Sequence, residues 1–477
     1  MGVLAEHSTG VRVNLPEREG GEVEPKATHC REGEAGCNVL QKGTMGDTSR
    51  SQTISTELQQ IAQQAAEYPD MIFTTLAHRI DIPLLREAYR QTNKKGAPGV
   101  DMVSAKEYAE NLEQNLLALH ARLKEGRYLA PPVMRVWIKK EDGKERPIGI
   151  PAFEDKVVQR AVEMLLSPIY EQIFYDFSMG FRKGRSQHQA IHNLREQCRN
   201  LNINWILSAD ITGLFDNINH ELLKDLIRLR VNDGRILQLI GKWLNAGVME
   251  DDRTTYPDKG TPQGGVVSPL LSNIFLHYVL DDWFVKVVLP RMKGKCFIIR
   301  WADDFIIGFE NELDARRIME VLPKRFAKYE LNLHPNKTVL MPFSKPPAKV
   351  SKDTRNGNFD FLGFTFYWSK SLKGYWVIKK KTAGKRLSRF MKMLWQWCKA
   401  YRHEPIEEQY AVLCSKLLGF YQYYGVRSNY KALEVVYEYA EKAWRRWLSR
   451  RSHKGTVWYE ELRKNFPFPK PRIVHNI

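Results

Sequence analysis

The segment from Cys296 to Phe309 reads CFIIRWADDFIIGF, in which two apolar runs flank a short polar centre. The runs Cys296–Arg300 and Phe305–Phe309 have the length and the aliphatic and aromatic content of buried strands. Only Trp301–Asp304 separates them, which leaves room for a tight turn and nothing longer. We therefore expect a β-hairpin that carries two adjacent carboxylates at its tip.

Adjacent carboxylates repel one another, and they persist either at a solvated turn or beside a cation that neutralises them. For Asp303 and Asp304 alone, the solvated turn is the better interpretation. Asp210 changes this balance, because it ends another short apolar strand, Trp205–Ile211. Three carboxylates at neighbouring strand ends would form the oxygen-only site that Mg²⁺ prefers. Two such ions about 4 Å apart can activate a 3′-hydroxyl and stabilise a leaving pyrophosphate.

Three motifs occur in a fixed order along the chain: ADITGLFDNI at 209–218, GTPQGGVVSPL at 260–270 and ADDF at 302–305. Together they resemble the ordered motifs of reverse transcriptases, and more narrowly of those encoded within group II introns. The resemblance extends from about Asn93 to the C-terminus. It implies an RNA-directed DNA polymerase that uses Mg²⁺, with Asp210, Asp303 and Asp304 as catalytic residues. The same three residues and Ile211 are the implied metal ligands.

The resemblance also implies contacts with the substrates. The nucleotide-binding residues are expected to be Lys140 and Arg146 at the triphosphate, Phe215 beneath the sugar, Gln263, and Lys337, which would protonate pyrophosphate. Phe361, Leu362 and Gly363 correspond to the primer grip. Without the family, Phe215 would be read as a core side chain, and Lys140 and Arg146 as solvated charges on a hairpin. One position departs from the family, which usually has Tyr where this chain has Trp301, and this puts fidelity, rate and primer handling in doubt.

The net charge of +18 is concentrated near the C-terminus. Residues 371–477 contain 23 Lys and Arg against 8 Asp and Glu, a net charge of +15. Such a field attracts polyanions and indicates a nucleic-acid partner rather than a merely solubilising surface. Cations and aromatic rings alternate there, although about half of the rings are expected to lie in a helical core. The RNA-binding candidates are Lys442, Arg445 and Arg446.

The bulk composition is that of a globular protein with reduced thiols. Six cysteines are scattered without a C-x-x-C pair, so disulfides and a zinc site are not expected. No apolar run has the ~20 residues of a membrane span, and no signal peptide is recognisable at the N-terminus. These features exclude membrane and secreted classes and predict a cytoplasmic protein, in the bacterial cytosol.

The expected fold is α+β, a right-hand polymerase with fingers and palm built from an antiparallel sheet plus helices, followed by an α-helical thumb. The predicted domains are a disordered leader at 1–67, fingers and palm at 68–365, a thumb or maturase (X) domain at 366–450, and a basic tail at 451–477. Three local patterns are specific. Ser104 and Glu107 predict a capping box that opens one helix to Arg127. Strands are expected at Val133–Ile138 and Arg146–Ile150, and Ser268 is expected to cap a helix that runs to about Val288.

The predicted function is RNA-directed DNA synthesis combined with binding of a host group II intron RNA to promote its splicing and mobility. The expected partners are this intron RNA, an RNA template with a DNA primer, target DNA and deoxynucleoside triphosphates, with a homodimer left open and no membrane. No DNA endonuclease activity is expected. The alternatives are an RNA-binding splicing factor with little or no polymerase activity, a reverse transcriptase without an intron, and a general RNA chaperone. A general RNA chaperone would not explain why three carboxylates lie at strand ends.

Overall fold

The computed structural model describes residues 45–139, 145–250, 253–256, 259–260, 264–347, 357–451 and 459–477. Residues 49–477 form one compact unit. The segment 45–67, which composition placed in the disordered leader, forms helix α1 (Met45–Glu67), and Ile54, Ile61 and Ala65 are buried in the core. The difference arises because these small apolar side chains recur on one face of the helix. No helix in the described ranges is long and apolar enough to cross a membrane.

The first region of the unit is mainly helical and contains α2 (Ile82–Gln91) and α5 (Phe153–Tyr170). The capping box at Ser104 is confirmed. The Ser104 hydroxyl accepts a hydrogen bond from the backbone N–H of Glu107, and the Glu107 carboxylate accepts one from the backbone N–H of Ser104. The single helix predicted beyond it is wrong, because Asn111 leaves helical geometry (φ −122°, ψ 38°) and divides α3 (Ala105–Glu110) from α4 (Leu112–Lys124). Asn115 donates to the Tyr108 carbonyl (3.0 Å) across this break.

The predicted hairpin is confirmed as β1 (Val133–Lys139) paired with β2 (Glu145–Ile150), while its turn lies outside the described residues. Its sheet is mixed rather than antiparallel as predicted, because β1 also pairs in parallel with β4 (Val248–Glu250). A parallel pair needs a long crossover, and more than one hundred residues of helix and sheet separate β1 from β4. The fourth strand is β5 (Arg253–Thr255).

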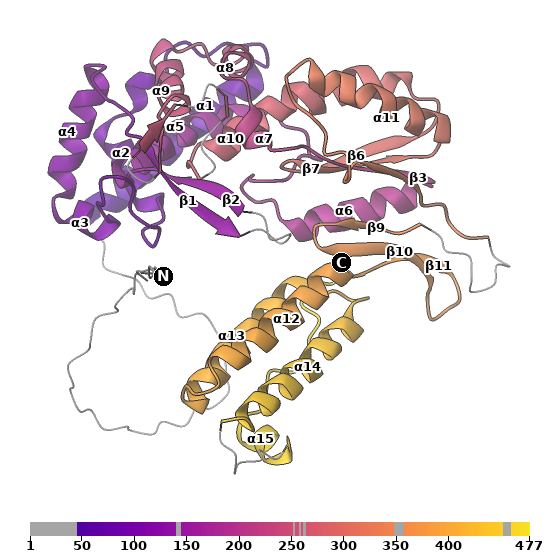
Figure 1. The fold of residues 1–477 in the computed structure, drawn as a ribbon. Helices are drawn as coiled ribbons and strands as arrows, with labels where there is room; N and C mark the ends of the chain where they lie inside the picture. Colours follow the sequence, from indigo (N-terminus) through magenta and orange to yellow (C-terminus); the bar gives the residue numbers. More distant parts are fainter. Residues whose placement is uncertain are drawn as a thin grey trace, which may run out of the picture. The chain divides into compact units, whose positions relative to one another are not determined.

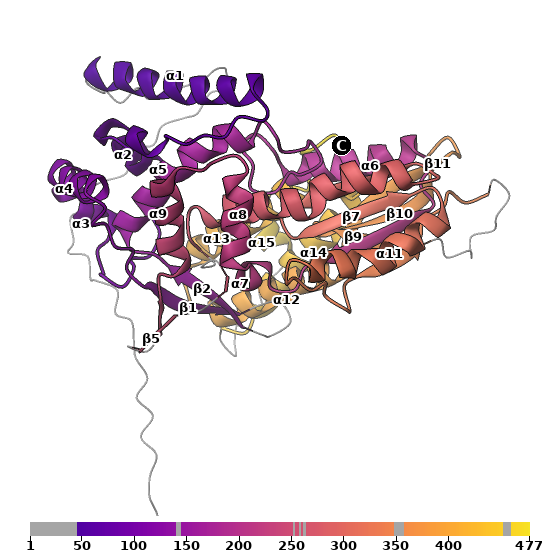
Figure 2. The same ribbon diagram turned by 90° about the horizontal axis from the view of Figure 1, so that it is seen from above.

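The central sheet has the strand order β6-β7-β3-β8 and is antiparallel throughout. Its strands are β3 (Trp205–Asp210), β6 (Cys296–Trp301), β7 (Asp304–Phe309) and β8 (Val339–Pro342). Helix α11 (Glu312–Ala327) packs on one face, where Ile307 and Phe305 point, and α6 (Gln187–Asn200) packs on the other against Ile299 and Ile306. Figures 1 and 2 show these helices on either side of the sheet. Burial on both faces explains the continuous apolar runs in the sequence.

The helix predicted from Ser268 to Val288 is confirmed in extent, since the chain stays helical from Ser268 through Val288, but its winding changes along the way. Ser268 is the first residue of α10 (Ser268–Leu276) rather than its cap, which is Val267. Beyond Leu276 the chain winds through two π-helical segments, His277–Asp281 and Phe284–Val288. Such widened turns are frequent at functional sites, and here one of them carries Asp281, which forms an ion pair with Arg300 of β6.

A second, three-stranded antiparallel sheet contains β9 (Phe359–Phe361), β10 (Phe364–Lys370) and β11 (Trp376–Thr382). Three long helices follow, α12 (Gly384–Ala400), α13 (Ile406–Tyr424) and α14 (Tyr430–Leu448), and α12 contacts α14 extensively. They share a separate hydrophobic core (Figure 1), as the predicted helical C-terminal region requires. The remaining short elements are η1 (Ala77–Arg79), α7 (Leu214–Asn217), α8 (His220–Arg228), α9 (Gly234–Leu244), η4 (Leu289–Arg291) and α15 (Tyr459–Asn465).

Candidate active site

The central sheet brings the three predicted carboxylates to one edge. Strand β3 ends at Asp210, which lies directly opposite Asp304, the first residue of β7. Asp304 also pairs with Trp301, the last residue of β6, and Asp303 lies in the turn between β6 and β7. The predicted hairpin is therefore confirmed, and its carboxylates lie beside Asp210 because an antiparallel register sets the end of one strand against the start of the next.

This edge is electrostatically strained. Burial, and then the charges of Asp210 and Asp303, raise the pKa of the Asp304 carboxyl to about 7. Burial and the nearby Asp210 also raise the pKa of Asp303, while the positive charges of Arg146 and Lys337 oppose this shift. Half-buried carboxylates that resist ionisation need positive charge to hold them in the ionised form.

Lys337 supplies part of that charge. Its Nζ donates to Asp210 Oδ2 (2.8 Å), although the lysine side chain is 59% exposed. The turn that carries it is fixed to β3, since His334 N donates to the Asp210 carbonyl (2.8 Å) and Thr212 N donates to the Asn332 carbonyl (2.9 Å). An ammonium group on the end of a long, exposed side chain is an exchangeable partner, so it leaves Asp210 free to accept a different cation.

Within the described ranges, no three His, Cys, Asp or Glu side chains are gathered into a ready-made metal site. Asp210, Asp303 and Asp304 are neighbours along the sheet edge. Their chemistry nevertheless fits a divalent cation: all three offer oxygen donors, and two have pKa values raised in the absence of one. Ile211, predicted as a main-chain ligand, has a buried side chain and forms a bridge with Leu333.

A buried arginine, absent from the sequence prediction, braces the acidic turn from below. Arg300 is completely buried, and its guanidinium forms a bidentate ion pair with the equally buried Asp281 (2.8 and 2.6 Å). It also donates to the carbonyl of Ala302 (3.1 Å) and to the Asn273 side chain (3.0 Å). The Ser178 hydroxyl accepts a further bond (2.5 Å). One side chain thus ties β6 to three other segments and to the turn itself.

The backbone of the turn needs this support. Ala302 has a φ of +56°, an uncommon conformation for a residue with a side chain. Gly180 packs against it so closely that an added Cβ would lie 2.3 Å from the Ala302 nitrogen. The Gly180 carbonyl in turn accepts from Asn273 (2.7 Å). A charge near the end of an otherwise apolar buried strand was the available signal for Arg300, because an unpaired cation is not tolerated there.

The motif at 260–270 reaches the same region through its glycines. Gly264 has a φ of +121°, and a Cβ on it would lie 2.4 Å from the Gly149 carbonyl of β2, so only glycine fits. The following backbone is held by Gln159, whose Oε1 accepts from Val266 N (2.7 Å). Gln159 Nε2 in turn donates to the carboxylate of the buried Asp155 (2.8 Å). Burial raises the pKa of Asp155 to about 6.

The predicted nucleotide contacts are only partly described. Lys140 and Gln263 lie outside the described residues, so their expected roles stay predictions. Arg146 is exposed on β2, close enough to Asp303 for its charge to affect that carboxyl. Phe215 is half-buried in α7, where the chain turns after Asp210, and it is not a core residue. The structure thus brings Arg146, Lys337 and the three carboxylates together.

The predicted primer grip forms a tight hairpin turn between β9 and β10. Leu362 (φ +48°) and Gly363 (φ +79°) are its two central residues. The Tyr423 hydroxyl donates to the Leu362 carbonyl (2.8 Å), and Ala383 N donates to that of Gly363 (2.9 Å). A Cβ on Gly363 would meet the Tyr424 hydroxyl at 2.8 Å. The turn is therefore seated on the C-terminal end of α13.

The RNA-binding candidates Lys442, Arg445 and Arg446 all lie on the exposed face of α14. Their contacts are modest: Lys442 pairs with Glu438 (3.3 Å), and Arg446 lies 5.7 Å from the ring centroid of Trp395. The rings between them are buried, with Trp444 only 1% exposed. The tryptophans of this helix therefore build its core, while the cations remain on the surface.

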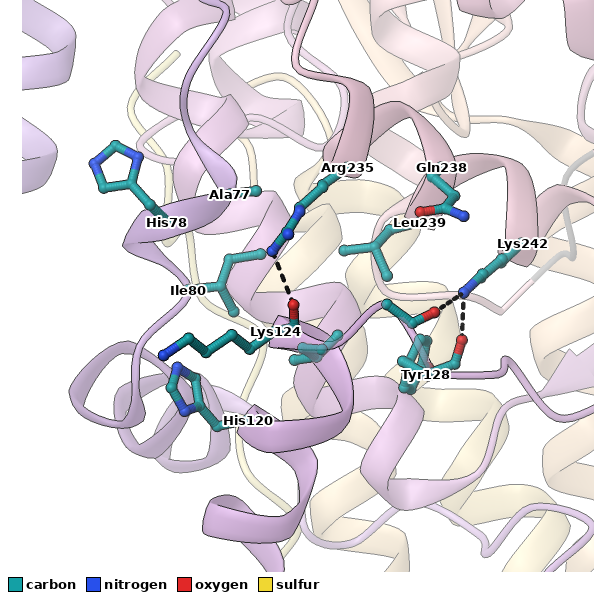
Figure 3. Close-up of a pocket in the computed structure, with 12 residues that line it drawn as sticks. Ala77, His78, Ile80, His120, Lys124, Tyr128, Arg235, Gln238, Leu239 and Lys242 are labelled. Carbon is teal, nitrogen blue, oxygen red and sulfur yellow. Dashed lines mark hydrogen bonds between the residues drawn. The ribbon is translucent and has the colours of Figure 1, made fainter.

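A small basic hollow of about 290 Å³ lies between η1, α4 and α9 (Figure 3). Its cations from α9 are already engaged: Arg235 donates to the Lys124 carbonyl (3.1 Å), and Lys242 donates to the carbonyls of Gly126 (3.2 Å) and Tyr128. These bonds satisfy the carbonyl of Lys124 at the end of α4 and two carbonyls of the segment that follows the helix. We assign a structural role to both side chains.

Comparison with known proteins agrees with the geometry. Residues 138–366 match the family model described as reverse transcriptase (RNA-dependent DNA polymerase). Protein YkfC of Escherichia coli K12 is 39% identical over 299 residues, which cover 55% of this chain and 78% of the relative. The group II intron-encoded protein LtrA of Lactococcus lactis is 29% identical over 489 residues, which cover 84% of this chain and 78% of the relative. The chain belongs to the group II intron reverse transcriptases.

The relatives include proteins that are named after introns. The putative COX1/OXI3 intron 1 protein of Saccharomyces cerevisiae is 26% identical over 359 residues, which cover 64% of this chain and 42% of the relative. The matched region of the family model contains all three carboxylates and the turn predicted to be the primer grip. This reverse transcriptase is thus an α+β protein of the reverse transcriptase/maturase type, which confirms the resemblance seen in its motifs.

Proposed function

We propose that this chain is an active RNA-directed DNA polymerase whose chemistry is carried by Asp210, Asp303 and Asp304. The observation that carries the proposal is the register of β3 and β7, which sets Asp210 against Asp304 beside a braced acidic turn. Raised pKa values at Asp303 and Asp304 support a site shaped for divalent cations, and Mg²⁺ is the ion we expect. In this assignment residues 68–365 are the fingers and palm, and α12–α14 are the thumb.

In the proposed reaction, the 3′-oxygen of a DNA primer attacks the α-phosphorus of a deoxynucleoside triphosphate, and the bond to pyrophosphate breaks. Bound Mg²⁺ would supply positive charge to the attacking and leaving oxygens. The three carboxylates, with the Ile211 carbonyl, would hold it. Arg146 and Lys140 would bind the triphosphate, and Gln263 would contact the nucleotide. Lys337, already at the edge beside Asp210, would donate a proton to the leaving pyrophosphate.

Primer extension tests this proposal directly. A DNA primer on an RNA template should be extended by the wild-type chain with Mg²⁺ and deoxynucleotides, and the product should disappear when Mg²⁺ is chelated. Binding of the template measured in parallel shows whether the protein is folded and competent. Absence of extension by a folded protein that binds its template would contradict the polymerase proposal and would favour a maturase without DNA synthesis. Trp301→Tyr would then be the first variant to measure.

A second component of the proposal is maturase function. The exposed cations Lys442, Arg445 and Arg446 on α14 and the net positive charge of the C-terminal region support binding of a host intron RNA, as the name of the Lactococcus relative suggests. We further propose target DNA as the acceptor of the mobile intron and the bacterial cytosol as the setting, since two of the relatives are bacterial. A homodimer stays a prediction.

Phe215 is expected to select deoxynucleotides. Its half-buried ring lies in α7, directly after the strand that ends at Asp210. A ring beneath the incoming sugar would clash with a 2′-hydroxyl, so Phe215→Val should increase ribonucleotide incorporation relative to deoxynucleotide incorporation by at least about tenfold. The measurement compares kcat/KM for matched ribo- and deoxynucleotides. Phe215→Tyr keeps the ring and should keep the discrimination, whereas unchanged discrimination in Phe215→Val would remove this residue from the selecting role.

A further inference from the structure

A large hollow of about 980 Å³ opens beside the β10–β11 hairpin. None of its lining residues belongs to the acidic edge that carries Asp210, Asp303 and Asp304. Its walls come from this hairpin, from α6, from the loop that leads into α14 and from the C-terminal segment. The described residues that line it include six cations and no Asp or Glu: Arg195, Lys373, Lys379, Lys380, Arg427 and Lys431. So many like charges repel one another unless an anion is bound among them.

Lys380 is the decisive member of this group. It is only 2% exposed, and within the described structure its Nζ is buried without any hydrogen-bond partner. Its backbone is fixed, because its amide donates to the Ser428 hydroxyl (3.1 Å) and that hydroxyl donates back to its carbonyl (2.5 Å). Burial of an ammonium group without a partner is costly, and such groups are retained where a ligand completes them.

The neighbours of Lys380 add to the cost. Burial, and then the charge of Arg195, lower the pKa of Lys380 to about 8, against a smaller opposing effect of Glu196. Two other cations of the hollow have partners, since Lys379 Nζ donates to the Lys370 carbonyl (2.8 Å) and Arg195 lies 4.0 Å from Glu196. Lys380 Nζ has none among the described residues. The Lys380 side chain forms part of the wall of this larger hollow.

Two aromatic rings accompany the cations. Tyr430 is 45% exposed at the start of α14, and Tyr367 lines the hairpin wall with Lys381 Nζ 5.2 Å from its ring centroid. Cations that track phosphates, together with rings on which bases stack, are the combination used to bind single-stranded nucleic acid. The hollow is also too large for a single phosphate ion, so several phosphates of one strand fit it better.

We propose that this hollow binds the phosphodiester backbone of a single-stranded nucleic-acid segment, with Lys380, Arg427 and Lys431 as its principal contacts. The site is distinct from the polymerase edge, which holds its own carboxylates, and from Lys442, Arg445 and Arg446 farther along α14. It lies where the β10–β11 hairpin meets α6 and the C-terminal segment, so a bound strand would hold these three segments together.

The test uses the full chain and a fluorescent single-stranded 20-nucleotide RNA, with DNA of the same sequence as a second probe. Arg427→Gln/Lys431→Gln should weaken binding several-fold and lower the slope of log affinity against log salt by about 1.4, at about 0.7 for each phosphate that the protein no longer neutralises. The matched control is Lys324→Gln/Lys328→Gln, which removes two exposed cations from the region of α11 and should change neither quantity. Equal affinities and slopes in the two double variants would overturn the proposal.

Lys380→Met provides an independent measurement. The free variant should melt at a higher temperature than the wild type, because an uncompensated buried charge is removed, and the RNA should stabilise it less. A variant that melts lower, or that gains as much stability from RNA as the wild type, would contradict the role of Lys380.

Comparing RNA with DNA binding shows which part of the nucleic acid is recognised, and comparing binding with primer extension separates this hollow from the acidic edge. Loss of binding to both RNA and DNA supports recognition of the backbone alone, and loss for RNA only supports an RNA strand recognised partly through its 2′-hydroxyls. Asp303→Asn should retain the binding of either probe. Loss of this site's binding signal in Asp303→Asn would overturn the separation of the hollow from the acidic edge, whereas failure of primer extension with an intact signal would count against the proposed polymerase alone.

Discussion

Asp303→Asn is expected to reduce DNA synthesis by at least about 10³-fold while leaving affinity for RNA unchanged. Asparagine keeps the shape of the side chain but removes one of the charges that would bind divalent cations. Metal ions stabilise a transition state by several kcal/mol, and each 1.4 kcal/mol corresponds to a factor of about ten in rate. Primer extension at saturating template, together with a binding titration, measures both quantities.

The same substitution should not weaken the fold. The raised pKa of Asp303 means that its ionised form is disfavoured in the metal-free protein, mainly by burial and then by Asp210. Ionised Asp303 therefore costs stability at neutral pH, and this cost disappears when the charge is removed. We expect Asp303→Asn to unfold at the same or a higher temperature than the wild type without Mg²⁺.

With Mg²⁺ added, the wild type should unfold at a higher temperature than Asp303→Asn. A ligand present at about 100 times its dissociation constant stabilises the native state by about 2.7 kcal/mol, and the variant lacks part of the site. The control is Asp225→Asn, which removes an exposed carboxylate from α8 and should leave synthesis, stability and the Mg²⁺ response near their wild-type values. A folded Asp303→Asn that loses RNA binding as severely as synthesis would refute the division of labour between the acidic edge and the RNA-binding surfaces.

Arg300→Met is expected to destabilise the protein by about 3–5 kcal/mol, because it leaves Asp281 as an unpaired charge in the core. Both partners of this ion pair have no exposed side-chain surface. The substitution also removes the bond to the Ala302 carbonyl, which supports the acidic turn. Chemical denaturation measures the first effect, and the rate of primer extension below the unfolding transition measures the second.

A double variant separates packing from positioning. Arg300→Met/Asp281→Leu replaces a buried ion pair by apolar side chains, a change that is often neutral for stability. We expect it to recover most of the folding free energy but to extend primers about 10²-fold more slowly than the wild type, since a misplacement of about 1 Å at a reacting group can cost that much. KM for the nucleotide should change less than kcat, because Arg300 acts through the turn and not on the substrate.

Recovery of full activity in the double variant would contradict the positioning role and leave Arg300 as a structural residue. Loss of activity together with normal stability would support it. Arg300→Lys serves as the conservative control: it keeps a positive charge near Asp281 but cannot form the same forked set of bonds. Partial stability with little activity is the expected result.

Much of the active site could be read from the sequence because its signals are local. The length of Cys296–Arg300 and Phe305–Phe309, and the four residues between them, determined a hairpin with Asp303 and Asp304 at its tip, and the structure agrees. The capping box at Ser104 and the strands on either side of residues 140–144 were equally local. Motif order then indicated the family, which the comparisons confirm.

Local patterns failed where distant packing decides the backbone. Asn111 divides a helix that its periodic leucines predicted as continuous. The helix expected to reach Val288 does so, but the sequence did not predict the π-turns near Asp281. The segment 45–67 was predicted as disordered on composition, yet it is helical and contributes Ile61 to the core. Propensity is a weak prior, and tertiary contacts override it when they bury enough apolar surface.

By itself the sequence determined the elements, the identities of the acidic residues and the basic character of the C-terminal region, since these depend on neighbouring residues and on total charge. Only the tertiary structure decided that Asp210 faces Asp304, that Arg300 braces the turn, and that Lys380 lies buried in a basic hollow. Each of these is a contact between segments far apart in the chain. Such contacts are set by strand register and side-chain packing, which no single stretch of sequence contains.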